Sequence, residues 1–149
     1  MYSTNETMRA IGRVMARYAQ ETAATMDADS VIEAAPLMKP WKAGSMTEPV
    51  AYKAGDVRTD ENQPWKCSQA HTHYGETGWN PAEARALWAP YHAKRKEYAL
   101  PYVAPTHAQD AYYTGEWMIW TDGLAYQALR DAVDRGPDVL PDDWAVAAE

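Results

Sequence analysis

Phenylalanine is absent from this 149-residue chain, although the chain contains 7 tryptophans and 10 tyrosines. A core that needs only bulk would use phenylalanine freely, because that side chain has no polar atom to satisfy. Tryptophan and tyrosine combine an apolar ring with a hydrogen-bonding tip, which suits partly exposed platforms and interfaces. The composition therefore favours a binding or assembly protein. Two alternatives stay open: chance bias in a small sample, and large rings used as bulk in a small β-structure.

Cysteine is almost absent too, and its one occurrence, Cys67, excludes a disulfide within the chain. We expect a small buried hydrophobe there, with an intermolecular bridge as the less favoured alternative. No run approaches the ~20 consecutive apolar residues of a membrane-spanning helix. The N-terminus also lacks the basic and then apolar segments of a secretory signal. We therefore expect no membrane partner.

Basic charge is in short supply, with 14 lysines and arginines against 21 acids and a net charge of -7. A protein that neutralises phosphates needs a basic stripe. The densest basic stretch, residues 92–96, is short and is interpreted as a solvated linker. The sequence thus argues against a nucleic-acid partner.

Catalytic motifs are missing as well. The paired acids Asp60-Glu61 and Asp142-Asp143 are adjacent in sequence, whereas glycoside hydrolysis needs two carboxylates held across a cleft. Neighbouring residues on a strand point to opposite faces, and in a loop they are solvated. The chain has no Gly-x-Ser-x-Gly elbow and no glycine-rich phosphate loop. We therefore predict that it is not an enzyme and needs no cofactor.

Three potential metal ligands, Cys67, His71 and His73, are closely spaced. A structural zinc site normally takes four ligands, and His92 or His107 would have to supply the last from far away. The position of Cys67 on a predicted strand favours burial for packing. The metal site is the less favoured interpretation, and we predict none.

Residues 1–30 are predicted to be helical. Ser3 or Thr4 can cap the helix, and Glu6, three residues after Ser3, completes a capping box. Apolar or aromatic residues then recur in alternating steps of three and four, which is heptad spacing. These predicted oligomerisation residues are Met8, Ile11, Met15 and Tyr18.

The heptad pattern continues onto Thr22 and Thr25, which are polar, so an isolated helix would be unstable in water. A dimer or trimer of the chain would bury the seam and stabilise it. An amphipathic helix packed on its own domain is the alternative that the pattern leaves open. We interpret the segment as a coiled-coil-like oligomerisation stalk.

After a linker at residues 31–40, the helical period disappears and short aromatic runs alternate with turn residues, as in small strands. Two stretches follow one pattern: an aromatic residue, two variable residues, glycine, an acid and a β-former. They are Tyr52–Val57 and, 60 residues on, Tyr112–Trp117. Later landmarks recur in the same order and are Trp65 and Tyr126, Pro81 and Pro141, Trp88 and Trp144. We expect an α+β fold with two small antiparallel β modules, residues 41–92 and 98–149.

The first unit resembles the small chitin-binding type of carbohydrate-binding module, families five and twelve. The resemblance rests on Trp41, the Tyr52–Val57 segment, residues 65–72 with their Cys-x-x-Ala-His-Thr pattern, Gly78-Trp79-Asn80-Pro81 and Ala86-Leu87-Trp88. It is similar in particular to the variant found in tail- and fibre-associated proteins of bacteriophages. The second unit, from Ala99 to Glu116, is similar to the degenerate repeat that often follows it there.

The resemblance implies exposed rings that stack on sugars, and by position these are Trp65, Trp79 and Trp88, with Trp41 and Tyr52 in the core. The short hairpin turn of that family is replaced by residues 59–64, which are longer and acidic. In the second unit, residues 117–120 are apolar on both faces of a strand, which favours burial against another subunit or the first module.

The main hypothesis is a non-enzymatic virion protein that decorates a tail, fibre or capsid and is assembled in the cytoplasm of a bacterial host. Its partners would be itself, other virion proteins and a host-surface glycan. The alternative is a dedicated module for binding chitin- or peptidoglycan-like glycans. A fragment of a polysaccharide-active enzyme is disfavoured because the catalytic pair is absent.

Overall fold

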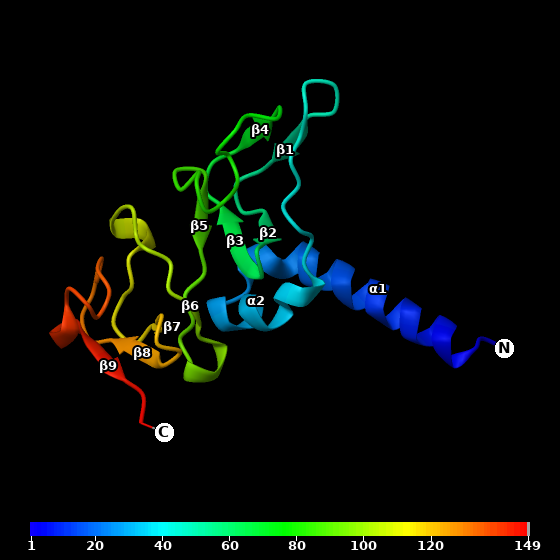
Figure 1. Ribbon diagram of the computed structural model, residues 1–149. Helices are drawn as coiled ribbons and strands as arrows, with labels where there is room; N and C mark the ends of the chain where they lie inside the picture. The colour runs from blue at the N-terminus through cyan, green and yellow to red at the C-terminus, as the bar shows by residue number, and fades with distance from the viewer. Residues whose placement is uncertain (149) are drawn as a thin grey trace.

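The computed structural model describes residues 1–148. Two helices are followed by two small β units that lie side by side (Figure 1). The helices are α1 (Thr4–Thr22) and α2 (Ala28–Ala34). The strands within the described residues are β1 (Val50–Tyr52), β2 (Val57–Asp60), β3 (Gln63–Cys67), β4 (His71–His73), β5 (Trp88–Pro90), β6 (Leu100–Pro101), β7 (Trp117–Ile119), β8 (Ala125–Ala128) and β9 (Trp144–Val146). The predicted α+β class, a helix followed by small antiparallel modules, is confirmed.

The capping box at the start of α1 forms as predicted. Glu6 N donates to Ser3 Oγ (3.1 Å), and Ser3 N donates back to a Glu6 carboxylate oxygen (2.9 Å). The helix ends earlier than residue 30. Thr22 Oγ1 donates to the Tyr18 carbonyl (2.7 Å) at its last turn, and a 3-10 turn, Ala23–Thr25, follows. Asp27 then caps α2 by accepting from Ser30 N (2.8 Å).

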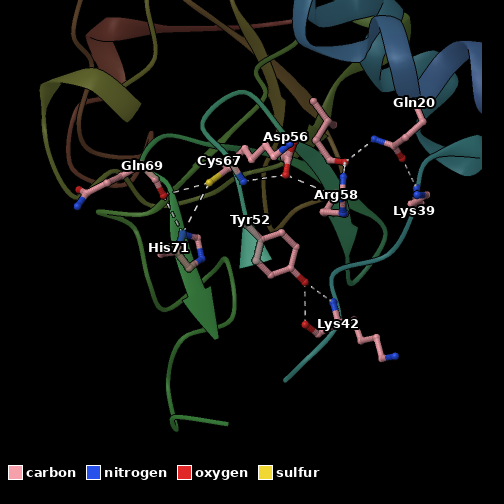
Figure 2. A network of polar contacts seen from close by, with 11 residues as sticks. Gln20, Lys39, Lys42, Tyr52, Asp56, Arg58, Cys67, Gln69 and His71 are labelled. Carbon is pink, nitrogen blue, oxygen red and sulfur yellow. Dashed lines mark hydrogen bonds and ion pairs between the residues drawn. The ribbon is translucent and has the colours of Figure 1, made fainter. Parts of the chain in front are cut away.

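The end of α1 and the whole of α2 pack on the first β unit. Their shared core holds Ala19, Ala23, Val31, Met38 and Val57. Gln20 ties the layers together, because its amide donates to the Val57 carbonyl (2.9 Å) and accepts from Lys39 N (2.7 Å), as Figure 2 shows. The rest of α1 projects away from the body (Figure 1).

The first β unit has a three-stranded sheet, ordered β2-β3-β5 and antiparallel throughout, and a two-stranded sheet of β1 and β4. The hairpin between β2 and β3 is tighter than predicted. Its turn is only Glu61-Asn62, and both residues have positive φ (50° and 64°). That geometry is a two-residue turn whose twist matches the strands. The expectation of a long acidic loop over residues 59–64 is therefore wrong, because the flanking residues pair in the ladder.

The second β unit is one sheet ordered β6-β7-β8-β9, in which only the β6–β7 pair is parallel. Its core is made of Tyr112, Met118, Ala128, Val133 and Trp144. Met118 is buried, whereas its neighbours on β7 are half-buried. The strand therefore faces the core with one side only.

The two β units share one backbone frame, offset by 60 or 61 residues through the hairpin and by 56 residues at the last strand, from Trp88 to Trp144. Gly55 N donates to the Cys67 carbonyl (2.8 Å), and Gly115 N donates to the Ala128 carbonyl (2.9 Å). Both glycines have φ near +90°, a conformation that other residues adopt only with strain. Corresponding strand pairs also have the same register: Val57–Lys66 and Trp117–Gln127 across the hairpin, Cys67–Trp88 and Ala128–Trp144 across the last pair.

The segment that enters each β unit and the central tyrosine of each unit also make equivalent hydrogen bonds. Trp41 N donates to the Thr59 carbonyl (2.7 Å), and Tyr102 N donates to the Ile119 carbonyl (2.9 Å). The residue after Trp41 or Tyr102 then donates its backbone N–H to a buried tyrosine hydroxyl of the same unit. The donors are Lys42 (2.9 Å) and Val103 (3.0 Å). The tyrosines are Tyr52 and Tyr112. The repeat seen in the sequence landmarks thus corresponds to a repeat of hydrogen bonds.

Arg85 joins the two β units. Its guanidinium lies over the Trp65 ring, 5.3 Å from the centroid, and donates to Asp110 at 2.7 Å. The carboxylate of Asp110 is fully buried and also accepts from Thr106 N (3.0 Å), Thr106 Oγ1 (2.9 Å) and His107 N (3.0 Å). A ring of the first unit and a carboxylate of the second thus hold the same side chain.

Candidate functional site

Two of the three predicted stacking rings are buried. Trp65 is 3% exposed and Trp88 is 0% exposed, and they form the core of the first unit with Tyr52 and Cys67. The expectation that Trp65 and Trp88 are exposed is therefore wrong. A unit with so few strands obtains most of its buried apolar area from large rings, so these rings are taken up by the core. The core position expected for Tyr52 is confirmed.

Trp79 is different, because its ring is only half-buried. It lies on the segment between β4 and β5, and its centroid is 6.2 Å from both imidazoles of β4, His71 and His73. These two histidines share one face of the strand, since side chains alternate along it. Trp79 thus covers the inner face of β4 and keeps part of its ring accessible.

Trp41 extends this surface. It is also half-buried, and its centroid is 5.3 Å from that of His73. The His73 imidazole is buried at 3% exposure, and both indoles pack close to it. We call this row, Trp41, His73 and Trp79, the aromatic strip. Trp41, which the sequence placed in the core, packs against the core of the first unit and keeps part of its ring accessible. Sequence reasoning missed the role of His73, although the alternation of His71 and His73 along β4 was an available signal.

The strip is held rigidly by its central histidine. Gly44 N donates to His73 Nδ1 (2.8 Å), and His73 Nε2 lies 2.9 Å from the Glu76 carbonyl. An N–H donor at one nitrogen and a carbonyl at the other assign the neutral ring with its proton on Nε2. A side chain at Gly44 would not fit, because a Cβ there would lie 2.0 Å from the His73 carbonyl oxygen.

A second layer supports the strip from below. The Tyr52 hydroxyl accepts from Lys42 N (2.9 Å) and donates to the Lys42 carbonyl (2.7 Å), which fixes the loop that carries Trp41 (Figure 2). The Tyr52 ring packs edge-on against Trp88, 5.1 Å between centroids. Burial raises the pKa of the Tyr52 hydroxyl above its ordinary value, so it stays protonated and can donate.

Cys67 and His71 meet beneath the strip without forming a reactive pair. Cys67 Sγ lies 3.7 Å from His71 Nδ1, and both side chains contact the Gln69 carbonyl (Figure 2). Burial raises the pKa of the Cys67 thiol, so the thiolate that nucleophilic chemistry needs is disfavoured. The third residue of the proposed metal set, His73, is already bonded at both nitrogens. Within residues 1–148 no three His, Cys, Asp or Glu side chains are grouped closely enough to hold a metal ion.

Tyr74 adds a more exposed ring at the end of β4, with 46% of its surface accessible. Its backbone N–H donates to the Glu76 carboxylate, which fixes the turn after the strand. Sequence reasoning did not select it. A tyrosine directly after an alternating His-x-His strand was the available signal.

The second unit has no counterpart of the strip within its described residues. The β1–β4 pair is reduced there to a single bridge between Tyr112 and Val133. Trp120, the residue after β7, instead packs edge-on against Tyr102, with 5.0 Å between the ring centroids, and lies against Gly136. Among residues 1–148, the aromatic strip is therefore present in the first unit only.

The predicted oligomerisation residues all lie exposed on α1. Met8, Ile11, Met15 and Tyr18 are between 50% and 62% accessible. They make a continuous apolar stripe on the projecting part of the helix. No helix among residues 1–148 is long and apolar enough to cross a membrane.

Comparison with known proteins places the first unit. The model of carbohydrate-binding module family 5/12 matches residues 40–89. Chitinase Chi52 of Paenibacillus xylanexedens is 46% identical over 48 residues, which are 32% of this chain and 8% of the chitinase. A crystal structure of a family GH18 chitinase from Chromobacterium violaceum is 34% identical, over 42% of this chain and 17% of that one, with a TM-score of 0.30.

The match begins one residue before Trp41 and ends one residue after Trp88. It therefore includes the whole aromatic strip and stops short of the second unit. The resemblance to the chitin-binding type of module is confirmed for the first unit. The bacteriophage variant stays a prediction, since both named relatives are chitinases. Residues 40–89 thus match a family of binding modules, carbohydrate-binding module family 5/12.

Proposed function

We propose that this protein binds a chitin-type glycan through the aromatic strip of residues 40–89. The observation that carries the proposal is the partly exposed indole of Trp79, which packs near the His73 imidazole in a segment that matches a carbohydrate-binding module. An aromatic face matches the apolar C–H face of a β-linked sugar. Because the ring is already fixed by its neighbours, little side-chain entropy is lost on binding.

Trp41 and Trp79 flank His73 and are the two rings that offer accessible surface along the strip. A polymer chain lying along it would contact two successive rings. Hydroxyl groups at its edge would meet backbone and carboxylate acceptors of the turn at Glu76. The proposal requires binding alone, and no bond of the glycan is broken.

The test is retention of the purified chain on insoluble chitin. Trp79→Ala should weaken binding by about tenfold or more, because the loss of one ring contact amounts to ~1.5–3 kcal/mol. Trp79→Phe should retain most of the affinity. Tyr113→Ala, a change of an exposed ring on the second unit, is the matched control and should have no effect. Equal binding by wild type and Trp79→Ala, with unchanged melting temperatures, would contradict the proposal.

The second unit, residues 98–149, is proposed to be a degenerate copy of the same module that supports the first. The shared hydrogen-bond frame and the Arg85–Asp110 contact favour this role. In the chitinases that the chain resembles, it matches only a small share of the enzyme, 8% and 17% of their lengths. Targeting of a larger protein to chitin is therefore part of the proposal.

A role in virion assembly is the second candidate, and it would place the chain in a particle assembled in a bacterial cytoplasm. The exposed stripe on α1 favours some form of assembly. Detection of the chain in purified phage particles by mass spectrometry would support it. Its absence from such particles would leave glycan binding alone.

A further inference from the structure

The helix α1 projects from the body (Figure 1). It carries an apolar stripe of side chains that stay exposed among residues 1–148. On a helix of 3.6 residues per turn, the stripe spans an arc of roughly 80°. It consists of Met8, Ile11, Met15 and Tyr18, with Val14 at its edge. Each of these side chains is at least half exposed.

The stripe does not face the protein's own body. The body contact of α1 is formed by its last turns, through Ala16, Ala19 and Gln20. Around the helix axis, the centre of the arc that these residues occupy lies about 100° from the centre of the stripe. The three arginines, Arg9, Arg13 and Arg17, lie on the side opposite to the stripe. The helix therefore has a body face, a basic solvent face and a third, apolar face without a partner.

A free helix of this length is marginal in water. Roughly the first 13 residues of α1 extend beyond the body contact, and isolated helices below about 12–15 residues are scarcely stable. Gly12, in the middle of this part, costs about 1 kcal/mol relative to alanine. Packing of the apolar face is the remaining source of stability.

We propose that the stripe packs against the same stripe of a second copy of this chain. Because the stripe residues are spaced alternately by three and four positions, their side chains have the arrangement of the interface residues in a coiled coil. An interfacial helix on a lipid surface would present a broader apolar face. The net charge of -7 would also oppose approach to an anionic membrane.

The size of the stripe sets the strength of the contact. Five half-exposed side chains offer on the order of 500 Å² per copy, so a pair buries about 1,000 Å², below the range of standard stable interfaces. Association through so small an interface therefore should depend on protein concentration. A trimer would bury more surface per helix than a dimer.

Self-association would strengthen binding to a chitin surface, an effect that rests on the proposed function. A chitin surface presents many sites, and linked modules bind it with an avidity that no single module has. Association itself is measured without glycan, so its failure and the failure of chitin binding can be told apart.

The experiment is analytical ultracentrifugation of the full chain from about 1 to 200 μM, followed by chitin binding. The wild type should sediment as a concentration-dependent dimer or trimer. The double variant Ile11→Gln/Met15→Gln should be monomeric, because glutamine keeps helix propensity but removes the apolar contact. Ala10→Gln, off the stripe, is the matched control and should associate as the wild type does. On insoluble chitin the double variant should bind about tenfold or more weakly, with unchanged affinity for a soluble chitin oligomer.

A wild type that stays monomeric at 200 μM would overturn the proposal, as would association that the double variant does not change. Vesicles of phosphatidylcholine with phosphatidylglycerol separate the lipid alternative. If the monomeric wild type binds them and the double variant does not, the stripe belongs to a membrane surface, and the proposal is wrong.

Discussion

The contact between Arg85 and Asp110 allows a sharp test of how the two β units depend on each other. Asp110→Asn keeps the shape of the side chain and removes its charge. The guanidinium of Arg85, whose side chain is 10% exposed, would then face a neutral amide. The amide would also present N–H groups where Thr106 and His107 now donate. The buried guanidinium would lose its negatively charged partner, and the N–H donors of the new amide would face N–H and O–H donors of the protein.

Removing one partner of a buried ion pair typically costs about 3–5 kcal/mol. For a chain of this length such a loss lowers the melting temperature by roughly 10 °C. Calorimetry or thermal melting by circular dichroism measures it. Asp131→Asn is the control, because that carboxylate also binds a threonine, Thr114, but is exposed. The control should shift the melting temperature far less.

The same contact predicts acid sensitivity. Burial alone would raise the pKa of Asp110, but hydrogen bonds from His107 and Thr106 and the charge of Arg85 outweigh it, so the pKa lies below its ordinary value. A lowered pKa gives stability that is present above the unfolded value of about 3.9 and is lost as the pH falls through the folded value. Wild type should therefore lose stability below about pH 4, and Asp110→Asn should lose less over that range. Equal melting temperatures of wild type and Asp110→Asn at pH 7 would refute the reasoning.

Three further substitutions test other parts of the structure. Gly44→Ala should abolish chitin binding and lower the melting temperature, because its Cβ would lie 2.0 Å from the His73 carbonyl oxygen; unchanged binding would contradict the packing of the strip. The same change at Gly12, where a Cβ meets nothing within 4 Å, should stabilise α1 by about 1 kcal/mol and raise helicity by circular dichroism. Trp88→Ala should destabilise the first unit by about 3–5 kcal/mol in denaturant titration, because the ring is fully buried, whereas Trp79→Ala should destabilise it less, because that ring is partly exposed.

Local features of the fold could be predicted because their causes lie within a few residues. The capping box of Ser3 and Glu6 spans three residues, and the turn at Gly55 needs only a positive φ that glycine permits. The end of α1 was missed because the heptad spacing runs on through Thr22 and Thr25, whereas the chain turns into a 3-10 helix, Ala23–Thr25, directly after Thr22. Threonine at a heptad position leaves that outcome open in the sequence.

The site was harder to predict because exposure depends on distant pairing. Trp65 and Trp88 are buried by the β3–β5 ladder, which joins residues more than twenty positions apart. The hydrogen bond from Gly44 to His73 spans 29 positions. A resemblance in the order of tryptophans identifies the module but does not say which ring faces solvent. The burial of each ring answers that question, and only Trp79 among the three predicted rings stays accessible.

Comparison of the two units distinguishes the frame of the module from the aromatic strip that it supports. Both keep a glycine turn, Gly55 or Gly115, and the same strand register, and these features form their common frame. Only the first unit adds the β1–β4 sheet, and this sheet carries His73 beneath Trp79. A unit that retains the frame without the added sheet can still pack, as the second does through Asp110. The aromatic strip can therefore change without loss of the frame that supports it.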